Sequence, residues 1–380
     1  MKFPKIRSVA LFTLFGLSGV AEDLTVFFGT GGRGSEGIYK TTFNTSTGKF
    51  GTIDLAAESQ SPGFLALHPD GDKLYAVERW DNDAGAAGYR IEEDGSLTLV
   101  NRVSSGDGPG AHLAVHPTGK FLITAQYGGG SVALFPINTE GQLGIPKLYE
   151  HEGSSGVVER RQKAPHPHWT GFSPDGRFAL VPDLGKDGIV IYRVDAETPS
   201  LVPHGFAASV PGGGARHMRF SPNGEYIYLL NELTLDVSTF KWNGDTGTAT
   251  LLTTTPTLTE AAKSAESFNS AAEILVHPDL PTLYTSNRGH DSVSVFQIGS
   301  NPEDLEVVQV QPVRGAFPRN INLDPSGSWL LAAGADSNTV SAHRIDSESG
   351  KLTYQRRSVI NVPNPICILF VPGKNAPPKG

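Results

Sequence analysis

Residues 212–233, GGGARHMRFSPNGEYIYLLNEL, contain the unit that decides the fold of this chain. An apolar run precedes the turn Ser-Pro-Asn-Gly at 221–224, and a second β-rich run, YIYLLN, follows it. Proline presets φ at the first corner of such a turn, and glycine accepts the positive φ that is needed later. After a polar loop, VSTFKW at 237–242 has the mixed apolar and polar pattern of a half-buried strand.

The same unit recurs along the whole chain, which makes it an internal repeat. The turns read HPDG, HPTG, SPDG, SPNG, a degenerate HPD, and DPSG, with prolines at Pro69, Pro117, Pro174, Pro222, Pro278 and Pro325. The spacing is shortest, 47 residues, from 278 to 325 and longest, 57 residues, from 117 to 174. A seventh, incomplete copy falls at Val371-Pro372.

These repeats predict an all-β fold, a seven-bladed β-propeller. A repeat of this size cannot bury its sheet alone, so neighbouring repeats must stack. The seventh copy lacks its outer part after Pro372, and we expect strands at 24–29 and 37–43 to complete it. The ring is then closed by N- and C-terminal strands. A β-sandwich, or a pair of them, is the alternative, but the regular spacing argues against it.

Composition and charge agree with many short strands and turns. The 380 residues include 44 glycines and 27 prolines, and 18% are charged, which argues against helical bundles and coiled coils. The net charge is −8, and the sequence contains no long run of lysine and arginine. Nucleic-acid binding is disfavoured because neutralising phosphates needs a basic stripe.

The N-terminus has the pattern of a secretory signal peptide at 1–21. Lys2, Lys5 and Arg7 precede an apolar stretch at 9–21 that is too short to span a bilayer. We therefore expect a secreted protein with no membrane attachment after cleavage, and a single propeller domain at 22–380. Asn44-Thr45-Ser46 is a glycosylation sequon that is consistent with secretion.

The sequence predicts neither a metal nor a cofactor. Its one cysteine, Cys367, lies in the apolar run ICILF, so we expect a buried structural thiol rather than a nucleophile. There is no His-Glu-x-x-His or cysteine-rich metal motif. The glycine-rich stretches at 31–34 and 128–130 lack the P-loop lysine, and no Gly-x-Ser-x-Gly elbow is present.

Several cationic and imidazole side chains are expected at one mouth of the central channel. The first strand of each blade lines that channel, and the strand starts carry His112, His168, Arg216, His217, Glu273 and Arg319. The second strands end near the same mouth, at Glu232 and Arg288. Such groups are costly to bury unpaired, so they must pair with each other or with a ligand. A basic pocket in an acidic chain indicates a small carboxylate or phosphate held by arginine.

Five strings resemble the lactonase family of seven-bladed propellers, which includes bacterial 6-phosphogluconolactonases and fungal carboxy-cis,cis-muconate cyclases. They are AQYGGGSVALFPI, HPHWTGFSPDGRFALVPDLGKDGIVIYRVD, GGGARHMRFSPNGEYIYLLNEL, AAEILVHP and SNRGHDSVSVFQI. The resemblance extends from about Leu24 to Pro372. It implies a catalytic set of one histidine, two arginines and one glutamate, which match His168, Arg216, Arg288 and Glu232 in this sequence. We expect His112, His217, Glu273 and Arg319 to contact the substrate, although Glu273 also suits a structural role.

Three functions are consistent with these residues. A lactonase would open a small anionic or sugar lactone, with Arg216 and Arg288 anchoring the anion and His168 or Glu232 activating water. A carboxymuconate cyclase-type cycloisomerase would use the same arginines for carboxylates and His168 or Glu232 to move the proton. A non-catalytic secreted binding protein or surface antigen is the third. The expected partner is a small lactone or carboxylate, and a closed ring is expected to be a monomer.

Overall fold

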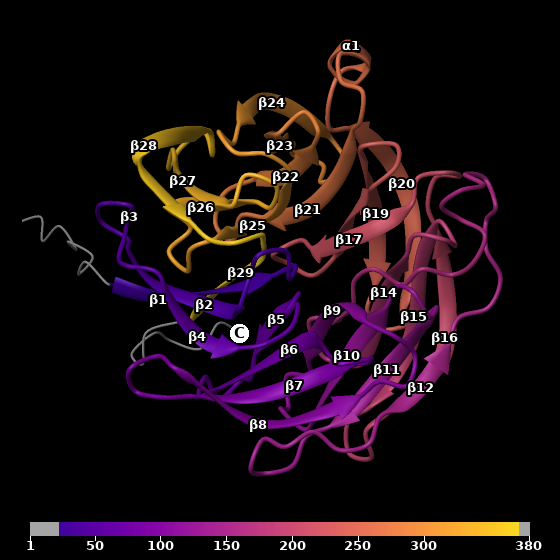
Figure 1. Cartoon of the computed structure of the whole chain (residues 1–380). Coiled ribbons are helices and arrows are strands. Elements are labelled where there is room, and N and C mark those ends of the chain that lie inside the picture. The colour runs from indigo at the N-terminus through magenta and orange to yellow at the C-terminus, as the bar shows by residue number, and fades with distance from the viewer. Residues whose placement is uncertain (1–22, 372–380) are drawn as a thin grey trace, which may run out of the picture.

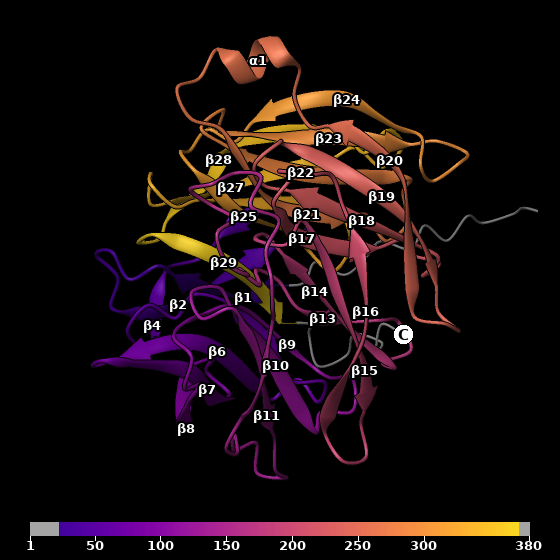
Figure 2. The ribbon, with the colours of Figure 1, turned by 90° about the vertical axis from the view of Figure 1, so that its right-hand side faces the viewer.

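The computed structural model describes residues 23–371, and the predicted signal peptide lies outside them. Seven β-sheets are arranged around a central axis, as the face-on view shows (Figure 1) and the view turned by 90° supports (Figure 2). The inner strands of neighbouring blades contact one another around this axis: β29 contacts β5, β5 contacts β9, and β17 contacts β21. The chain is therefore an all-β seven-bladed propeller, as the repeats predicted.

Six blades consist of four consecutive antiparallel strands each. Following the chain, these blades are β5 (Leu65–Leu67), β6 (Lys73–Trp80), β7 (Asp83–Ile91) and β8 (Leu97–Ser104); β9 (Gly110–Val115), β10 (Phe121–Gln126), β11 (Ser131–Pro136) and β12 (Lys147–Glu150); β13 (Gly171–Phe172), β14 (Phe178–Asp183), β15 (Gly188–Asp195) and β16 (Ser200–Ala208); β17 (Ala215–Phe220), β18 (Tyr226–Asn231), β19 (Asp236–Asn243) and β20 (Thr248–Pro256); β21 (Ser270–Val276), β22 (Thr282–Arg288), β23 (Ser292–Ile298) and β24 (Leu305–Pro312); β25 (Pro318–Leu323), β26 (Trp329–Gly334), β27 (Thr339–Ile345) and β28 (Leu352–Asn361).

The seventh blade joins the two ends of the chain, which confirms the predicted closure. It contains β29 (Pro365–Val371), β1 (Asp23–Thr30), β2 (Gly37–Asn44), β3 (Lys49–Phe50) and β4 (Asp54–Glu58). β1 pairs with β2 on one side and with β29 on the other, with Val26 opposite Phe370. Because β29 supplies the inner strand of this blade, the first and last parts of the chain share one sheet and the ring is closed.

The Pro-x-Gly turns also connect neighbouring blades. A turn histidine donates from Nε2 to the carbonyl of a turn glycine in the next blade, in the pairs His68–Gly119 (3.1 Å), His116–Gly176 (3.1 Å) and His277–Gly327 (2.8 Å). The glycines have positive φ, for example +71° at Gly119, which other residues rarely adopt. The repeated His-Pro dipeptides thus have a structural role on the face where these turns lie.

The apolar core lies between blades rather than within one central mass. Each interblade cluster combines the faces of two adjacent sheets; one of them packs Val26, Phe28 and Phe43 of the closing blade against Trp329 and Leu331 of its neighbour. Phe43 meets Trp329 edge to face, with ring centroids 5.6 Å apart. No helix in residues 23–371 is long and apolar enough to cross a membrane.

Two long segments differ from simple surface loops. In the segment at 253–270, β20 extends to Pro256 and the short helix α1 (Glu260–Ser264) follows, capped by the Thr259 hydroxyl. The segment at 151–167 carries one isolated bridge, between Pro167 and Asp183. One of its side chains, Arg161, contacts Glu232 at the end of β18.

Cys367 is buried in the closing blade, as predicted for a structural thiol. Its Sγ accepts a hydrogen bond from the Leu65 amide at 3.4 Å, and burial raises its pKa to about 12. Because the thiolate is the reactive form, we expect no reaction of the folded protein with Ellman's reagent at pH 8 and full reaction after unfolding in guanidinium. Rapid labelling of the folded protein would contradict this placement.

Candidate active site

The first part of the site joins the start of β17 to the end of β18. Ala215 pairs with Asn231 where these strands reach one face of the ring; Arg216 lies at the bulge that follows Ala215, and Glu232 follows Asn231. Arg216 Nη1 donates to Glu232 Oε2, and its Nε donates to the carbonyl of Ala272 at 2.8 Å. Both side chains are buried, so this is an interior ion pair that also links two blades.

Two further arginines converge on the same carboxylate. Arg288, at the end of β22, lies 3.3 Å from Glu232 Oε2 and donates to the carbonyl of Ala271 at 2.8 Å. Arg161 donates to Glu232 Oε1 at 2.6 Å and to the Tyr127 hydroxyl at 3.2 Å. Arg161 comes from the 151–167 segment and is more open, with 36% of its side chain exposed. The carboxylate of Glu232 is thus bound on both oxygens.

Glu232 and the arginines around it, called the arginine group below, carry a net positive charge. Burial alone would raise the pKa of Glu232, but Arg216, Arg288 and Arg161 outweigh it and hold that pKa well below its usual value. Burial, together with the neighbouring charge of Arg216, lowers the pKa of Arg288. The same two causes lower the pKa of Arg319, on β25, to about 10, with Glu232 opposing them. Guanidinium groups therefore outnumber carboxylates, which favours an anionic ligand here.

His168 precedes β13 and is held by its backbone, whose amide donates to the carbonyl of Pro182 at 3.0 Å. Its Nε2 lies 2.5 Å from Nη1 of Arg216. Arginine can act only as a donor, so Nε2 is the acceptor and the ring proton of a neutral His168 must sit on Nδ1. This Nδ1 is buried without a hydrogen-bond partner among residues 23–371. Burial and the nearby arginine lower the pKa of His168 well below its usual value.

A second polar group lies further along β17. His217 Nδ1 is 3.0 Å from Glu273 Oε1, and Arg219 Nη2 donates to the same oxygen at 3.0 Å. The other oxygen, Oε2, accepts from Asn320 Nδ2 at 2.7 Å. Burial raises the pKa of Glu273, but His217 and Arg219 outweigh it and the result is about 2, so the group is ionised at neutral pH.

This pairing fixes the tautomer of His217. Burial lowers its pKa to about 4 despite the opposing effect of Glu273, so the ring is neutral at pH 7. A neutral ring next to a carboxylate places its proton on Nδ1, and Nε2 then keeps a free lone pair. In the described part of the chain this Nε2 is buried without a partner. The His217 ring centroid is 5.2 Å from that of His168, so the two groups are neighbours.

His112 lies against aromatic rings rather than in the arginine group. Its ring centroid is 4.3 Å from Phe64, 5.3 Å from Trp169 and 5.5 Å from His217. The Thr170 amide lies 3.4 Å from His112 Nδ1, which acts as the acceptor. His112 therefore packs among aromatic rings and lies next to His217.

The structure brings the four expected catalytic residues together. Arg216 contacts both His168 and Glu232, and Arg288 contacts Glu232. Of the four expected substrate contacts, His217 and Glu273 pair with each other in the buried second group, His112 packs beside them, and Arg319 lies within electrostatic reach of Arg216 and Glu232. The catalytic and substrate-binding roles of these eight residues stay predictions. In residues 23–371, no group of three or more His, Cys, Asp or Glu side chains is placed to hold a metal ion.

Sequence reasoning missed Arg161 and Arg219. Arg161 lies in an irregular segment with no repeat position to align it, so the sequence carried no signal for its contact with Glu232. Arg219 could have been found, because it lies two residues after His217 on β17, and alternate residues of a strand share a face.

Comparison with known proteins agrees with this architecture. The profile of the lactonase family, described as a seven-bladed β-propeller, matches residues 25–370. The chain is 31% identical over 341 residues to a 6-phosphogluconolactonase of Bacillus subtilis, covering 89% of this chain and 95% of that one. It is 33% identical over 326 residues to a 6-phosphogluconolactonase of Formosa agariphila, covering 83% and 90% of the two chains.

A solved structure has a similar fold. The periplasmic gluconolactonase of Pseudomonas aeruginosa superposes with a TM-score of 0.83 at 27% identity, covering 92% of this chain and 99% of that one. The family match extends over nearly all the described residues and includes the segments that carry both polar groups. The chain belongs to the seven-bladed β-propeller lactonase family.

Proposed function

We propose that this protein hydrolyses a small lactone that carries a negative charge. The observation that carries this proposal is the excess of guanidinium groups around Glu232, next to a buried neutral imidazole with a free lone pair. The first feature binds an anion and stabilises the charge that develops on the ester oxygen, and the second activates water. The names of the relatives, 6-phosphogluconolactonase and gluconolactonase, support the same reaction class.

Arginines suit the anion because they present several donors in a fixed plane. Arg216 and Arg288 already use some donors on Glu232 and on the carbonyls of Ala272 and Ala271, which orients them. Arg161 is more exposed, although it binds Glu232, and Arg319 has no ion pair among the described residues, so both have donors left for a ligand. We assign substrate anchoring to Arg161 and Arg319, and oxyanion stabilisation to Arg216 and Arg288.

We assign water activation to His217, rather than to His168 or Glu232. The lone pair on Nε2 of His168 accepts from Arg216, and the arginines surrounding Glu232 make it a weak base. His217 instead has its Nδ1–H oriented by Glu273 and its Nε2 unengaged. A buried carboxylate that orients a histidine also stabilises the imidazolium formed when the ring accepts a proton. Glu273 is therefore a positioning residue.

The reaction then needs no further co-reactant. Water adds to the lactone carbonyl carbon while its proton moves to Nε2 of His217, and the carbonyl oxygen becomes an oxyanion facing the arginines. When the tetrahedral intermediate collapses, the bond to the ring oxygen breaks and that oxygen takes the proton from His217. The product is an open hydroxy acid, and its new carboxylate suits the same arginines.

The expected location of the protein limits the classes of lactone that it can meet. If residues 1–21 are a signal peptide, the protein works outside the cytosol, where the cytosolic metabolite 6-phosphogluconolactone is an unsuitable substrate. The name of the Pseudomonas relative, a periplasmic gluconolactonase, supports an extracytoplasmic lactone without phosphate. The arginine excess favours a lactone with a carboxylate of its own. We propose a secreted protein, to be tested by N-terminal sequencing and by the mass of Asn44 peptides after secretion.

The test is hydrolysis of 6-phosphogluconolactone, glucono-δ-lactone and a carboxymuconolactone by wild type and Arg288→Ala. We expect turnover of at least one of the two charged lactones, and a loss in kcat/KM of about 10²–10³-fold in the variant, as for removal of an oxyanion donor. Arg90→Ala is the control, because Arg90 is exposed and pairs with Glu92 far from the site. A wild type that is inert on all three lactones, or that hydrolyses only the uncharged glucono-δ-lactone, contradicts the proposal.

A cycloisomerase is the second candidate, because four arginines can hold the two or more carboxylates of a muconate skeleton. Incubation with carboxymuconate in the cyclising direction distinguishes it from a hydrolase. If neither reaction occurs while the wild type binds the carboxylates in calorimetry, the protein is a binding protein.

A further inference from the structure

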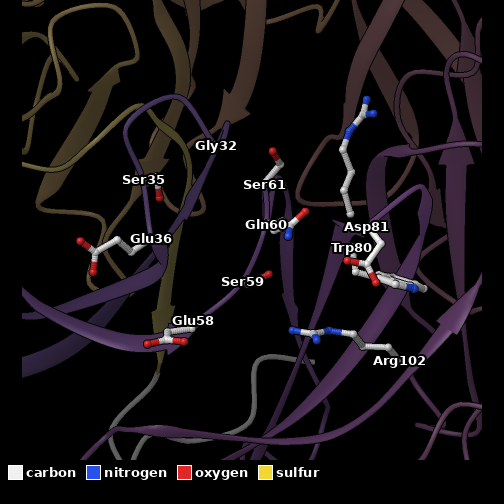
Figure 3. Close-up of a pocket in the computed structure, with 11 residues that line it drawn as sticks. Gly32, Ser35, Glu36, Glu58, Ser59, Gln60, Ser61, Trp80, Asp81 and Arg102 are labelled. Atoms are coloured by element: carbon white, nitrogen blue, oxygen red, sulfur yellow. The ribbon is translucent and has the colours of Figure 1, made fainter.

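A polar cavity of about 770 Å³ lies between the closing blade and the β5–β8 blade (Figure 3). It is lined by the 32–36 loop, the segment after β4, the end of β6, and β8. The lining residues are Gly32, Ser35, Glu36, Glu58, Ser59, Gln60, Ser61, Arg79, Trp80, Asp81 and Arg102. None of them belongs to the arginine group or to the His217–Glu273 pair. Its volume is in the range of pockets that enclose small molecules.

A buried carboxylate contacts two of the lining residues of this cavity. Glu78, whose side chain is fully buried, accepts hydrogen bonds from the Ser59 hydroxyl and from the Tyr89 hydroxyl, the latter at 2.8 Å. Its Oε2 also lies 3.4 Å from Nε of Arg102. Ser59 and Arg102 line the cavity, so Glu78 holds two of its polar groups in place. The proposed lactone reaction uses none of these residues.

Trp80 gives the cavity an aromatic wall. Figure 3 shows its indole on the same side as Asp81 and Arg102, with Glu36 and Glu58 across from it. The side chain is half-buried, and within residues 23–371 its ring has no stacking, cation–π or hydrogen-bond partner. A large apolar ring with an uncommitted N–H at a cavity wall is suited to a ligand with one apolar face and polar edges.

The charges of the lining are mixed. Three carboxylates, Glu36, Glu58 and Asp81, line the cavity together with two guanidinium groups, Arg79 and Arg102. The net charge is close to neutral, unlike that of the arginine group, so this lining does not favour an anion. Gln60 and the serines add groups that can both donate and accept. Such a set matches hydroxyl groups, each of which donates and accepts at once.

We propose that this cavity binds a neutral saccharide, a mono- or disaccharide whose C–H face stacks on Trp80. The hydroxyl groups of the sugar donate to Glu58, Glu36 and Asp81 and accept from Arg102 and Arg79. β6 ends at Trp80 as β18 ends at Asn231 in its own blade, so the cavity opens on the same face of the ring as the arginine group. This saccharide site is separate from the lactone reaction and does not depend on it.

The test is calorimetric titration of the full chain with glucose, maltose and cellobiose, with glucose 6-phosphate as the charged probe. We expect millimolar or tighter binding of at least one neutral sugar. Any heat from the phosphate ester at the arginine group should persist in Trp80→Ala, so only the part that this variant removes reports the cavity, and that part should be weaker than for the neutral sugar. Trp80→Ala should weaken binding about tenfold or more, because aromatic stacking and the lost apolar contact are both removed. Glu58→Gln, which keeps the shape, should weaken binding without affecting the fold.

Matched variants separate this site from the other. Phe206→Ala removes an exposed aromatic ring on β16 and should leave sugar binding unchanged. Arg288→Ala should also leave it unchanged, whether or not the protein hydrolyses a lactone. Absence of heat with every neutral sugar at 50 mM (a concentration about fiftyfold above a Kd of about 1 mM), or binding that Trp80→Ala does not alter, overturns the proposal.

Discussion

Replacing His217 by glutamine should lower kcat on the lactone that wild type hydrolyses by about 10²–10⁴-fold, the range for loss of a general base. KM should stay nearly constant, because the arginines that hold the anion are untouched. Glu273→Gln should lower kcat in the same way, since the histidine loses the carboxylate that orients its Nδ1–H and stabilises its protonated form. The measurement is steady-state kinetics over a range of pH.

The pH profile distinguishes a base from a structural residue. The pKa of His217 is lowered to about 4, so the ring is the neutral base above that pH and is protonated below it. Wild-type kcat/KM should therefore be level near neutral pH and fall as the pH drops through about 4, as long as the protein stays folded. The residual kcat/KM of His217→Gln should not show this fall as the pH drops through about 4.

A matched control is available in another blade. His343 is fully buried on β27, its pKa is also lowered to about 4, and its Nε2 contacts the Ser341 hydroxyl at 3.2 Å. His343→Gln should change thermal stability but leave kcat and its pH profile intact. If His217→Gln retains wild-type kcat while the wild type turns over a lactone, the base is another group and the lactone reaction itself still stands.

Replacing Glu232 by glutamine should destabilise the fold by about 3–5 kcal/mol at pH 7, because one partner of a buried ionic group is lost. Arg216, Arg288 and Arg161 would then crowd together without their carboxylate. The free energy of unfolding from urea titration measures the effect. Glu225→Gln is the control, since Glu225 is exposed and pairs with exposed Lys241, and it should cost less than about 1 kcal/mol.

The loss of unfolding free energy in Glu232→Gln should depend on pH, and the direction of this dependence follows from the pKa of Glu232. The folded pKa of Glu232 lies below its usual value of 4.5, so its carboxylate contributes stability above that pH and loses it as the pH falls towards the folded pKa. The difference between wild type and Glu232→Gln should therefore shrink below about pH 4.5. Added sulfate should stabilise the variant more than the wild type, because an anion can replace the missing charge. A constant difference from pH 7 to pH 3 would contradict the arrangement.

The sequence by itself determined the architecture of this protein. The Pro-x-Gly turns recur at a spacing that only stacked four-stranded units satisfy, and the incomplete last copy required the N-terminal strands to close the ring. Both features are local patterns repeated along the chain, so they can be read without knowing any long-range contact. The strand starts also placed Arg216 and His217 near the axis, because a blade's first strand always occupies that position.

Only the tertiary structure decided which partner each of these side chains contacts. Arg216 and His217 are neighbours in sequence, yet one joins Glu232 and His168 and the other joins Glu273, on a different blade. Arg161 reaches Glu232 across 71 residues from a segment outside the repeat. Which lone pair of a histidine is free depends on the donors and acceptors that other blades bring to it. The packing of the closed ring sets those contacts, and no pattern within a single repeat contains them.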